Sequence, residues 1–138
     1  MANTLKVITA SASDTDGTGA DLAADTDRIL YKVPGSTTAI VVGFHVSNIV
    51  TNTIKITVTV NSDTTGVSTL FGVSGGNGTN GVNKPAFLVK DVAIPESSTI
   101  ELLSGNKIFL QATDELKIQC DTAAGFNTIF SFPAFLYF

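Results

Sequence analysis

The residue types that most often perform chemistry are few and scattered in this chain. His45 is the only histidine and lies between Phe44 and Val46, while Cys120 is the only cysteine. A zinc site needs several nitrogen or sulfur ligands, and a nucleophilic triad needs a base held by a third group. One histidine and one distant cysteine supply neither arrangement. We therefore expect His45 to have a structural role and Cys120 to be a buried, inert thiol.

Paired carboxylates are the remaining route to catalysis, as in glycosidases. The candidates in the second half of the chain are Asp91, Glu96, Glu101, Asp114 and Glu115. They mostly flank predicted turns, where acidic residues favour solvation and turn formation. We therefore expect no active site, no enzyme activity and no required cofactor.

An acidic segment near the N-terminus is the candidate metal site. Asp14, Asp16, Asp21, Asp25 and Asp27 lie within residues 11–27. Calcium is bound by about six to eight oxygen atoms, and Asp14, Asp16 and the following glycine form a fragment of a calcium loop. The fragment lacks the third ligand in register and the distal glutamate. We expect a solvated surface loop or arm, with a calcium site at Asp14, Asp16 and Asp21 as the alternative.

The elements that would position these residues are strands. Residues 38–60 predict a buried strand, a short polar turn and a second strand, in which Ile54, Ile56, Val58 and Val60 alternate with polar residues. Side chains of a strand alternate between its faces, so the second strand is half buried. Further strands are predicted at residues 5–9, 28–33, 86–94, 98–103, 107–111, 115–120 and 128–138.

No segment has the apolar stripe of a helix, and turn residues separate the strands at near-regular spacing. This pattern predicts an all-β, single-domain β-sandwich that resembles a jelly roll, with about eight or nine short antiparallel strands. Residues 1–27 would form an N-terminal strand and the acidic loop or arm. Residues 28–138 would form the sandwich, and the two parts would make one domain overall.

The last predicted strand is apolar on both faces. Its candidate contact residues are Phe130, Phe132, Phe135, Leu136, Tyr137 and Phe138. A surface strand of a monomer is polar on one face, so this strand should lie deep in the sandwich or in a subunit interface. Pro133 cannot donate a ladder hydrogen bond and therefore predicts an edge strand or a bulge.

The longest irregular segment spans residues 61–85 and is rich in glycine. Its centre contains Gly75, Gly76, Asn77 and Gly78. Such a composition buries too little apolar surface to offset the entropy of ordering, and loops of this length are uncommon unless they contact something. We expect an exposed loop that contacts a neighbouring subunit or a larger assembly.

Composition narrows the class of protein further. The formal net charge is −4 and the eight basic residues are scattered, which argues against a nucleic-acid surface. The first residues lack the apolar run of a signal peptide, and no segment approaches the ~20 apolar residues of a membrane helix, so we expect assembly in a cytosol. Charged residues make up only 14% of the chain. Either a Thr-, Ser- and Asn-rich surface or burial by other subunits would account for this shortage.

The order of segments from residue 28 to about residue 130 resembles small virion proteins of tailed bacteriophages. A strand ends at the Pro34-Gly35 turn, and an apolar strand ends at Asn48. Two further elements carry the resemblance: Ile94-Pro95 with Ile100 and Leu102, then Lys107, Ile108, Leu110, Asp114, Leu116 and Ile118. The acidic N-terminal segment and the very apolar C-terminal strand depart from it.

The resemblance implies a non-enzymatic virion protein, made in the host cytoplasm. A capsid decoration or cement protein is favoured, with the major capsid protein or other virion proteins as partners and a homotrimer as the favoured assembly. The alternative is a neck, tail or tail-fibre module that binds a receptor or carbohydrate. Sugar sites usually offer exposed aromatic platforms, and the absence of Trp with only two Tyr counts against a carbohydrate site.

Overall fold

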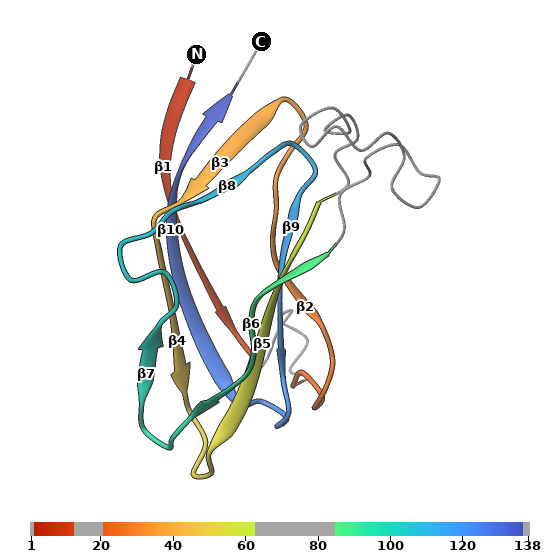
Figure 1. The fold of residues 1–138 in the computed structure, drawn as a ribbon, viewed down its shortest axis with the longest axis vertical. Coiled ribbons are helices and arrows are strands. Elements are labelled where there is room, and N and C mark those ends of the chain that lie inside the picture. The colour runs from red at the N-terminus through yellow and green to blue at the C-terminus, as the bar shows by residue number, and fades with distance from the viewer. Residues whose placement is uncertain (1, 13–20, 63–84, 137–138) are drawn as a thin grey trace, which may run out of the picture.

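The computed structural model describes residues 2–12, 21–62 and 85–136, with side chains for the same ranges except residues 2–5 and 128–136. These residues form two sheets that face each other, and the start of β1 and the end of β10 lie together at one end (Figure 1). Sheet A contains β1 (Ala2–Ser11), β3 (Thr37–Val41), β4 (Gly43–Asn48), β7 (Thr99–Glu101), β8 (Ile108–Leu110) and β10 (Phe126–Leu136). Sheet B contains β2 (Arg28–Lys32), β5 (Ile54–Asn61), β6 (Ala86–Ile94) and β9 (Glu115–Cys120).

Strand β10 lies inside sheet A. It pairs with β1 along one edge, and with β4 and then β3 along the other. β3 and β4 are two halves of one run interrupted at Val42, and β8 and β7 pair with these halves to complete the sheet. The apolar C-terminal strand is therefore flanked by other strands on both edges. The two predicted alternatives, a strand deep in the sandwich or a strand in a subunit interface, stay predictions.

Pro133 lies at the interruption between β3 and β4. Between the pair Ser131↔Gly43 and the pair Ala134↔Ala39, β10 advances by three residues, whereas the β3–β4 run advances by four. The β3–β4 run therefore contains one extra residue at this point. The Ala12 N–H donates to the Phe126 carbonyl, so even-numbered residues of β10 bond toward β1 and odd-numbered ones toward β3 and β4. The N–H that Pro133 lacks would thus point at the irregular side. The predicted bulge is confirmed.

Sheet B has the order β2-β9-β5-β6, and all of its pairs are antiparallel. The strict alternation predicted for the second strand is present in β5, where Ile54, Ile56 and Val58 are fully buried and Lys55 is exposed. The same alternation in β9 buries Leu116, Ile118 and Cys120. These side chains face those of sheet A.

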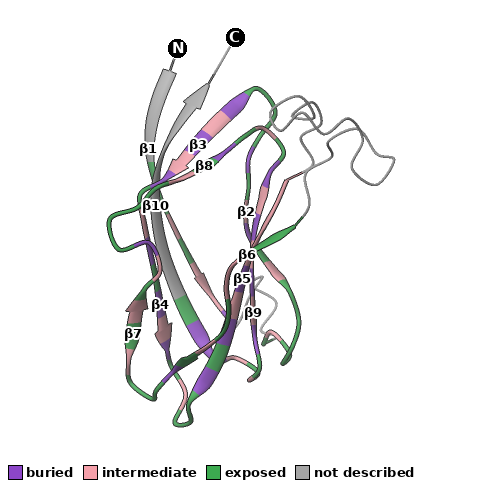
Figure 2. Ribbon diagram, in the orientation of Figure 1, coloured by how far each residue is buried: buried purple, intermediate pink, exposed green. Residues whose placement is uncertain are grey.

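The core lies between the two sheets (Figure 2). Sheet A contributes Ala39, Val41, Phe44, Val46, Leu110 and Phe126 to it, and the β5, β6 and β9 side chains of sheet B meet them. Burying a large apolar side chain contributes roughly 1.5–3 kcal/mol relative to exposing it. The aliphatic and aromatic residues that the strand pattern predicts to be buried therefore stabilise the packing of the two sheets.

The predicted all-β sandwich of short antiparallel strands is confirmed, with ten strands among the described residues rather than eight or nine. The split of residues 38–47 at Val42 accounts for one additional strand. β1 is also longer than the predicted residues 5–9, because all ten of its residues pair with β10. The strand order is compatible with a jelly roll, which remains our interpretation of the connectivity. The described ranges contain no helix that is long and apolar enough to span a membrane.

Candidate interaction surface

The outer faces of the two sheets differ in character. On sheet B, the strands turn mostly polar side chains away from the core: Lys32, Lys55, Thr57, Thr59, Glu115, Lys117 and Gln119. Its two edge strands, β2 and β6, also expose Ile29 (51%) and Phe87 (59%). On sheet A, apolar side chains interrupt the polar ones. Val7 of β1, Ile40 of β3, Val42 and Phe109 of β8 point outward there; we call these four residues the sheet A patch.

Strand register brings the sheet A patch together. Phe109 is the direct partner of Ile40, and Val42 follows two residues later on the same run. Val7 pairs with Ser131 of β10, and Ser131 pairs with Gly43 of β4 on its other side, so one strand, β10, separates Val7 from the interruption at Val42. Phe109 is 67% exposed and Val7 is 64% exposed. Apolar side chains on one face make this surface the candidate for contact with another molecule.

His45 and Glu101 lie next to the patch on the same face. His45 is exposed, and its Nε2 lies 2.5 Å from Oε2 of Glu101, its register partner on β7. The other carboxylate oxygen, Oε1, accepts hydrogen bonds from the N–H groups of Phe44 (3.3 Å) and Leu103 (3.0 Å). Glu101 therefore connects β4, β7 and the turn after β7. The expected structural role of His45 fits this contact.

The environment of Glu101 alters its acidity. Burial raises the pKa of its carboxyl, but the N–H donors of Leu103 and Phe44, followed by His45, lower it by more. The net result is a pKa below the ordinary value of 4.5. The carboxylate is thus the favoured form, and its negative charge is part of the face that the patch presents.

A second polar cluster lies at the end of the sandwich where the β8–β9 turn approaches the β2–β3 turn. Asp114 is buried there; its side chain accepts hydrogen bonds from the Ser62 hydroxyl (2.6 Å) and the Gln111 N–H (2.8 Å). Its carbonyl accepts from the Val33 N–H at 2.9 Å. One residue therefore joins the end of β5, the β8–β9 turn and the end of β2. Asp114 is a fold-determining residue, and the turn-forming role expected for these carboxylates holds for it.

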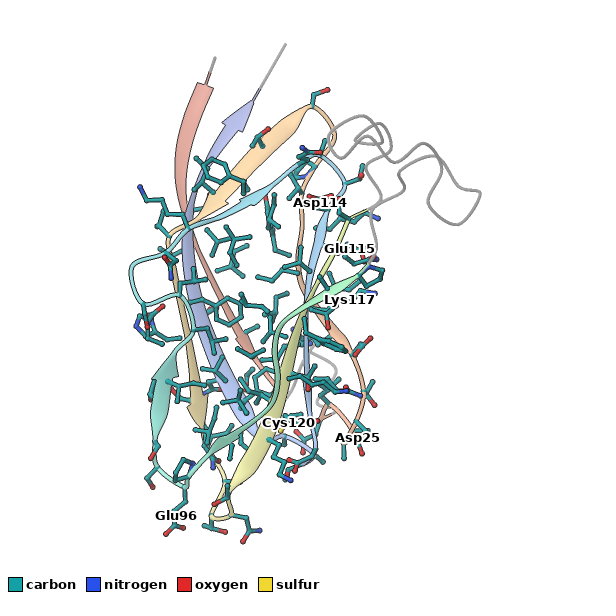
Figure 3. All side chains as sticks on the ribbon, viewed as in Figure 1. Asp25, Glu96, Asp114, Glu115, Lys117 and Cys120 are labelled. Atoms are coloured by element: carbon teal, nitrogen blue, oxygen red, sulfur yellow. The ribbon has the colours of Figure 1, made fainter. Side chains whose placement is uncertain are left out.

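Glu115 follows Asp114 but faces outward on sheet B (Figure 3). It pairs with Lys32 at 3.2 Å and with Lys117 at 3.4 Å. The hydrogen bond from Lys32 is the main cause that lowers the pKa of Glu115, and it outweighs the opposing effect of burial. This ion pair links β2 to β9. It is part of the polar outer face and not of the sheet A patch.

The opposite end of the sandwich holds Cys120. Its thiol is buried, and burial raises its pKa. The Thr122 N–H donates to Sγ at 3.4 Å, and a Cβ on Gly125 would approach Sγ to 2.9 Å. A buried thiol with a raised pKa is a poor nucleophile, as the alternation in β9 predicted.

The acidic segment is described only in part. Asp21, Asp25 and Asp27 are exposed, and the backbone of Asp25 is joined to β9 through the Cys120 carbonyl (2.7 Å) and the Gln119 side chain (2.6 Å). Residues 21–62, like the other described ranges, hold no group of three or more His, Cys, Asp or Glu side chains that could share a metal ion. Asp14 and Asp16 lie outside the described residues, so the calcium alternative stays a prediction.

The predicted contact residues divide in a similar way. The backbone of Phe130, Phe132, Phe135 and Leu136 lies in β10, whereas Tyr137, Phe138, Gly75, Gly76, Asn77 and Gly78 lie outside the described residues. Because neighbours flank β10 on both edges, an interface that uses this strand must use a face of sheet A.

Val7, Val42 and Phe109 were not selected from the sequence. The alternation of Ile108, Phe109 and Leu110 makes one of these three side chains point outward, and that was the available signal. Whether the outward side chain, Phe109, lies on the same face as Val7 depends on the pairing of β3 with β8, and the local sequence does not reveal this pairing.

Comparison with known proteins gives only distant likenesses. No protein family model and no curated protein sequence matches this chain. A chain of Bacillus endospore appendages, which form disulfide-linked pili, has a TM-score of 0.46 and 15% identity, covering 99% of this chain and 88% of that one. A chain of the T13 viral particle of IBDV has a TM-score of 0.44 and 8% identity, covering 96% of this chain and 35% of that one. At these scores the likenesses carry no argument about function.

Proposed function

We propose that this chain is a non-enzymatic structural protein of a virion, and that it decorates and stabilises the head shell. It would act in the virion after assembly in the host cytoplasm. Its partners would be the major capsid protein or other virion proteins, together with further copies of itself, with a trimer as the favoured form.

The observation that carries this proposal is the contrast between the two outer faces. The central strands of sheet B present paired charges and threonines, and its exposed apolar residues Ile29 and Phe87 lie on its two edge strands. Sheet A presents Val7, Val42 and Phe109 to solvent. Covering a fully exposed phenylalanine contributes roughly 1.5–3 kcal/mol. A small sandwich with one polar and one partly apolar face is suited to lie on another protein surface with the apolar side down.

The resemblance to tailed-phage virion proteins supports the proposal through the fold. Its carriers have structural roles here: Pro34 and Gly35 lie in the β2–β3 turn, Asn48 is buried at the end of β4, and Asp114 is the buried turn residue. These residues lie at the turns and strand ends of the sandwich, which supports the resemblance at the level of the fold. The low proportion of charged residues agrees with a surface that is partly covered in an assembly.

The loop of residues 61–85 would supply a second contact, with Gly75 to Gly78 at its centre. Both of its ends leave sheet B at one end of the sandwich, since β5 ends at Asn61 and β6 begins at Ala86. Deletion of residues 75–81 should leave the melting temperature unchanged and reduce incorporation into particles.

A matched pair of phenylalanine variants tests the role of the sheet A patch. Phe109→Ser removes an exposed phenylalanine from sheet A, while Phe87→Ser removes one that is 59% exposed from the edge of sheet B. We expect both variants to fold, and only Phe109→Ser to reduce the amount of protein that copurifies with particles. Equal incorporation of the two variants would refute a contact through sheet A.

Copy number in purified virions separates the head from other locations. A shell lattice repeats its subunits, so decoration requires on the order of hundreds of copies. Quantitative mass spectrometry that found about a dozen copies or fewer would instead favour the neck, tail or fibre alternative.

A further inference from the structure

The two sheets have four edges, and three of them are short or irregular. β7 and β8 share one edge of sheet A, and each is three residues long. β2 is five residues long and shifts register against β9 between Ile29 and Tyr31. Short and bulged edge strands resist pairing with other chains.

The edge strand β6 is long but strongly irregular. Its register against β5 shifts twice, between Ile56 and Val58 and between Val58 and Thr59. Asp91 has a φ of 52° and donates its N–H to the Thr57 hydroxyl at 3.1 Å. Bulges of this kind bend a strand and disrupt the regular spacing of N–H and C=O groups that a second strand would need.

β1 is the exception. Its ten residues pair with ten consecutive residues of β10 without any register shift, from Ala2↔Leu136 to Ser11↔Asn127. Within the described ranges, β10 is its only strand partner. The segment contains no proline and a single charged residue, Lys6. It therefore lacks the devices that blunt the other three edges.

The direction of the outward backbone groups of β1 follows from the ladder. Ala12 donates its N–H to the Phe126 carbonyl, so even-numbered residues of β1 bond toward β10. The N–H and C=O groups of Leu5, Val7 and Thr9 then point away from the sheet. These groups match what an added antiparallel strand would bond.

We propose that β1 pairs with β1 of a second copy of this chain, antiparallel and about a two-fold axis at Val7. In this register Val7 faces Val7 and Leu5 faces Thr9 of the other copy, which gives about six inter-strand hydrogen bonds. A two-fold axis lets one surface complete itself. The pairing continues sheet A from one copy into the next.

Several registers would keep the outer faces of the two joined sheets on the same side. The sequence of β1 favours the axis at Val7 among them. An axis at Lys6 would place two like charges directly opposite, which destabilises a strand pair. An axis at Leu5 would place Val7 opposite Asn3. The axis at Val7 covers a side chain that is 64% exposed with its own copy and sets Lys6 opposite Ile8.

This contact goes beyond the proposed function, because it commits to a two-fold pairing through a strand edge, which neither the capsid-facing surface nor the trimer specifies. It shares Val7 with the sheet A patch but does not use Phe109. The two tests therefore fail independently: particle incorporation reports on the face, and self-association of the purified chain reports on the edge.

Disulfide trapping measures the register. Opposed residues in a hydrogen-bonded antiparallel pair have Cα atoms about 5.5 Å apart, within the range that a disulfide accepts. Val7→Cys should form a linked dimer under mild oxidation. Thr9→Cys should not link to itself, because its two copies would lie about 13 Å apart. An equimolar mixture of Leu5→Cys and Thr9→Cys should link.

The matched controls make each outcome decisive. Cys120 is buried and should not form disulfides with the introduced cysteines. Val7 and Thr9 are exposed, so their cysteine variants should have the melting temperature of the wild type. The proposal is overturned if Val7→Cys links no faster than Thr9→Cys, or if the Leu5 and Thr9 mixture stays unlinked. In the unmodified chain, amide exchange at Val7 should slow as protein concentration rises; exchange that is independent of concentration would also contradict it.

Discussion

At the scale of single residues, Gly125 has no room for a side chain. A Cβ there would lie 2.9 Å from the Cys120 Sγ and 3.0 Å from the Thr122 carbonyl oxygen, and the latter is backbone that cannot rotate away. We expect Gly125→Ala to lower the free energy of unfolding by about 1–3 kcal/mol, as overpacking does. Denaturant unfolding measures this change.

Gly35 is the matched control for this substitution. A Cβ at Gly35 meets no atom within 4 Å, so Gly35→Ala should change stability by no more than about 0.5 kcal/mol. If the two alanine variants were equally stable, the close packing around Gly125 would be wrong.

Asp114 provides a second residue-scale prediction. Its carboxylate accepts hydrogen bonds from Ser62 and Gln111, and Asp114→Ala would remove this acceptor from both donors. Removing the acceptor of part-buried donors costs about 1–3 kcal/mol, so the denaturation midpoint should fall. Asp27→Ala, at an exposed position, should stay close to the wild type.

At the scale of elements, Glu101 fixes β7 to β4 and makes this contact sensitive to acid. The pKa of Glu101, like that of Glu115, is lowered in the folded protein relative to 4.5. The unfolded chain therefore takes up protons first as the pH falls, and the stabilisation present above pH 4.5 is lost below it.

Unfolding measured at a series of pH values tests this sign. The free energy of unfolding should decrease as the pH falls from 4.5 toward the lowered pKa values, and Glu101→Gln should make that decrease smaller. Glu96→Gln, in the exposed β6–β7 turn, is the charge-matched control. A steeper decrease in Glu101→Gln than in Glu96→Gln would contradict the assignment.

Alternation and turn residues were sufficient to predict most elements from the sequence. Ile54, Ile56 and Val58 are buried as their spacing predicted, and Pro133 marked a real bulge. The interruption at Val42 was not visible, because an apolar run reads the same with or without an extra residue. It depends on how β10 pairs with two strands distant in sequence.

The candidate surface was harder to predict than the strands. Phe109 and Val7 are separated by about one hundred residues, and only sheet order places them on one face. The burial of Asp114 was hidden for the same reason: its partner Ser62 is 52 positions away. The contact residues proposed from β10 were chosen because the alternation makes this strand apolar on both faces, and their role as an interface stays a prediction.

At the scale of the whole molecule, self-association should stabilise the fold. A partner that binds only the folded chain raises its apparent stability by mass action. We expect the melting temperature to rise with protein concentration over the micromolar range. Phe87→Ser should retain this dependence, and Val7→Lys should weaken it because the strand edge would then carry opposed like charges. A melting temperature that is independent of concentration would count against any stable oligomer.

The pairing of β1 with β10 also determines how the molecule responds to force. Ala2 is the register partner of Leu136, so the outer ends of both strands lie next to each other. Tension applied to these two ends would load the last hydrogen-bonded pair alone and then each next pair in turn, in the manner of a zipper. Tension applied between the opposite ends of the two strands would load all pairs at once. The sandwich should therefore yield at low force when it is pulled by its termini and resist far more when it is gripped at opposite ends of the sheet.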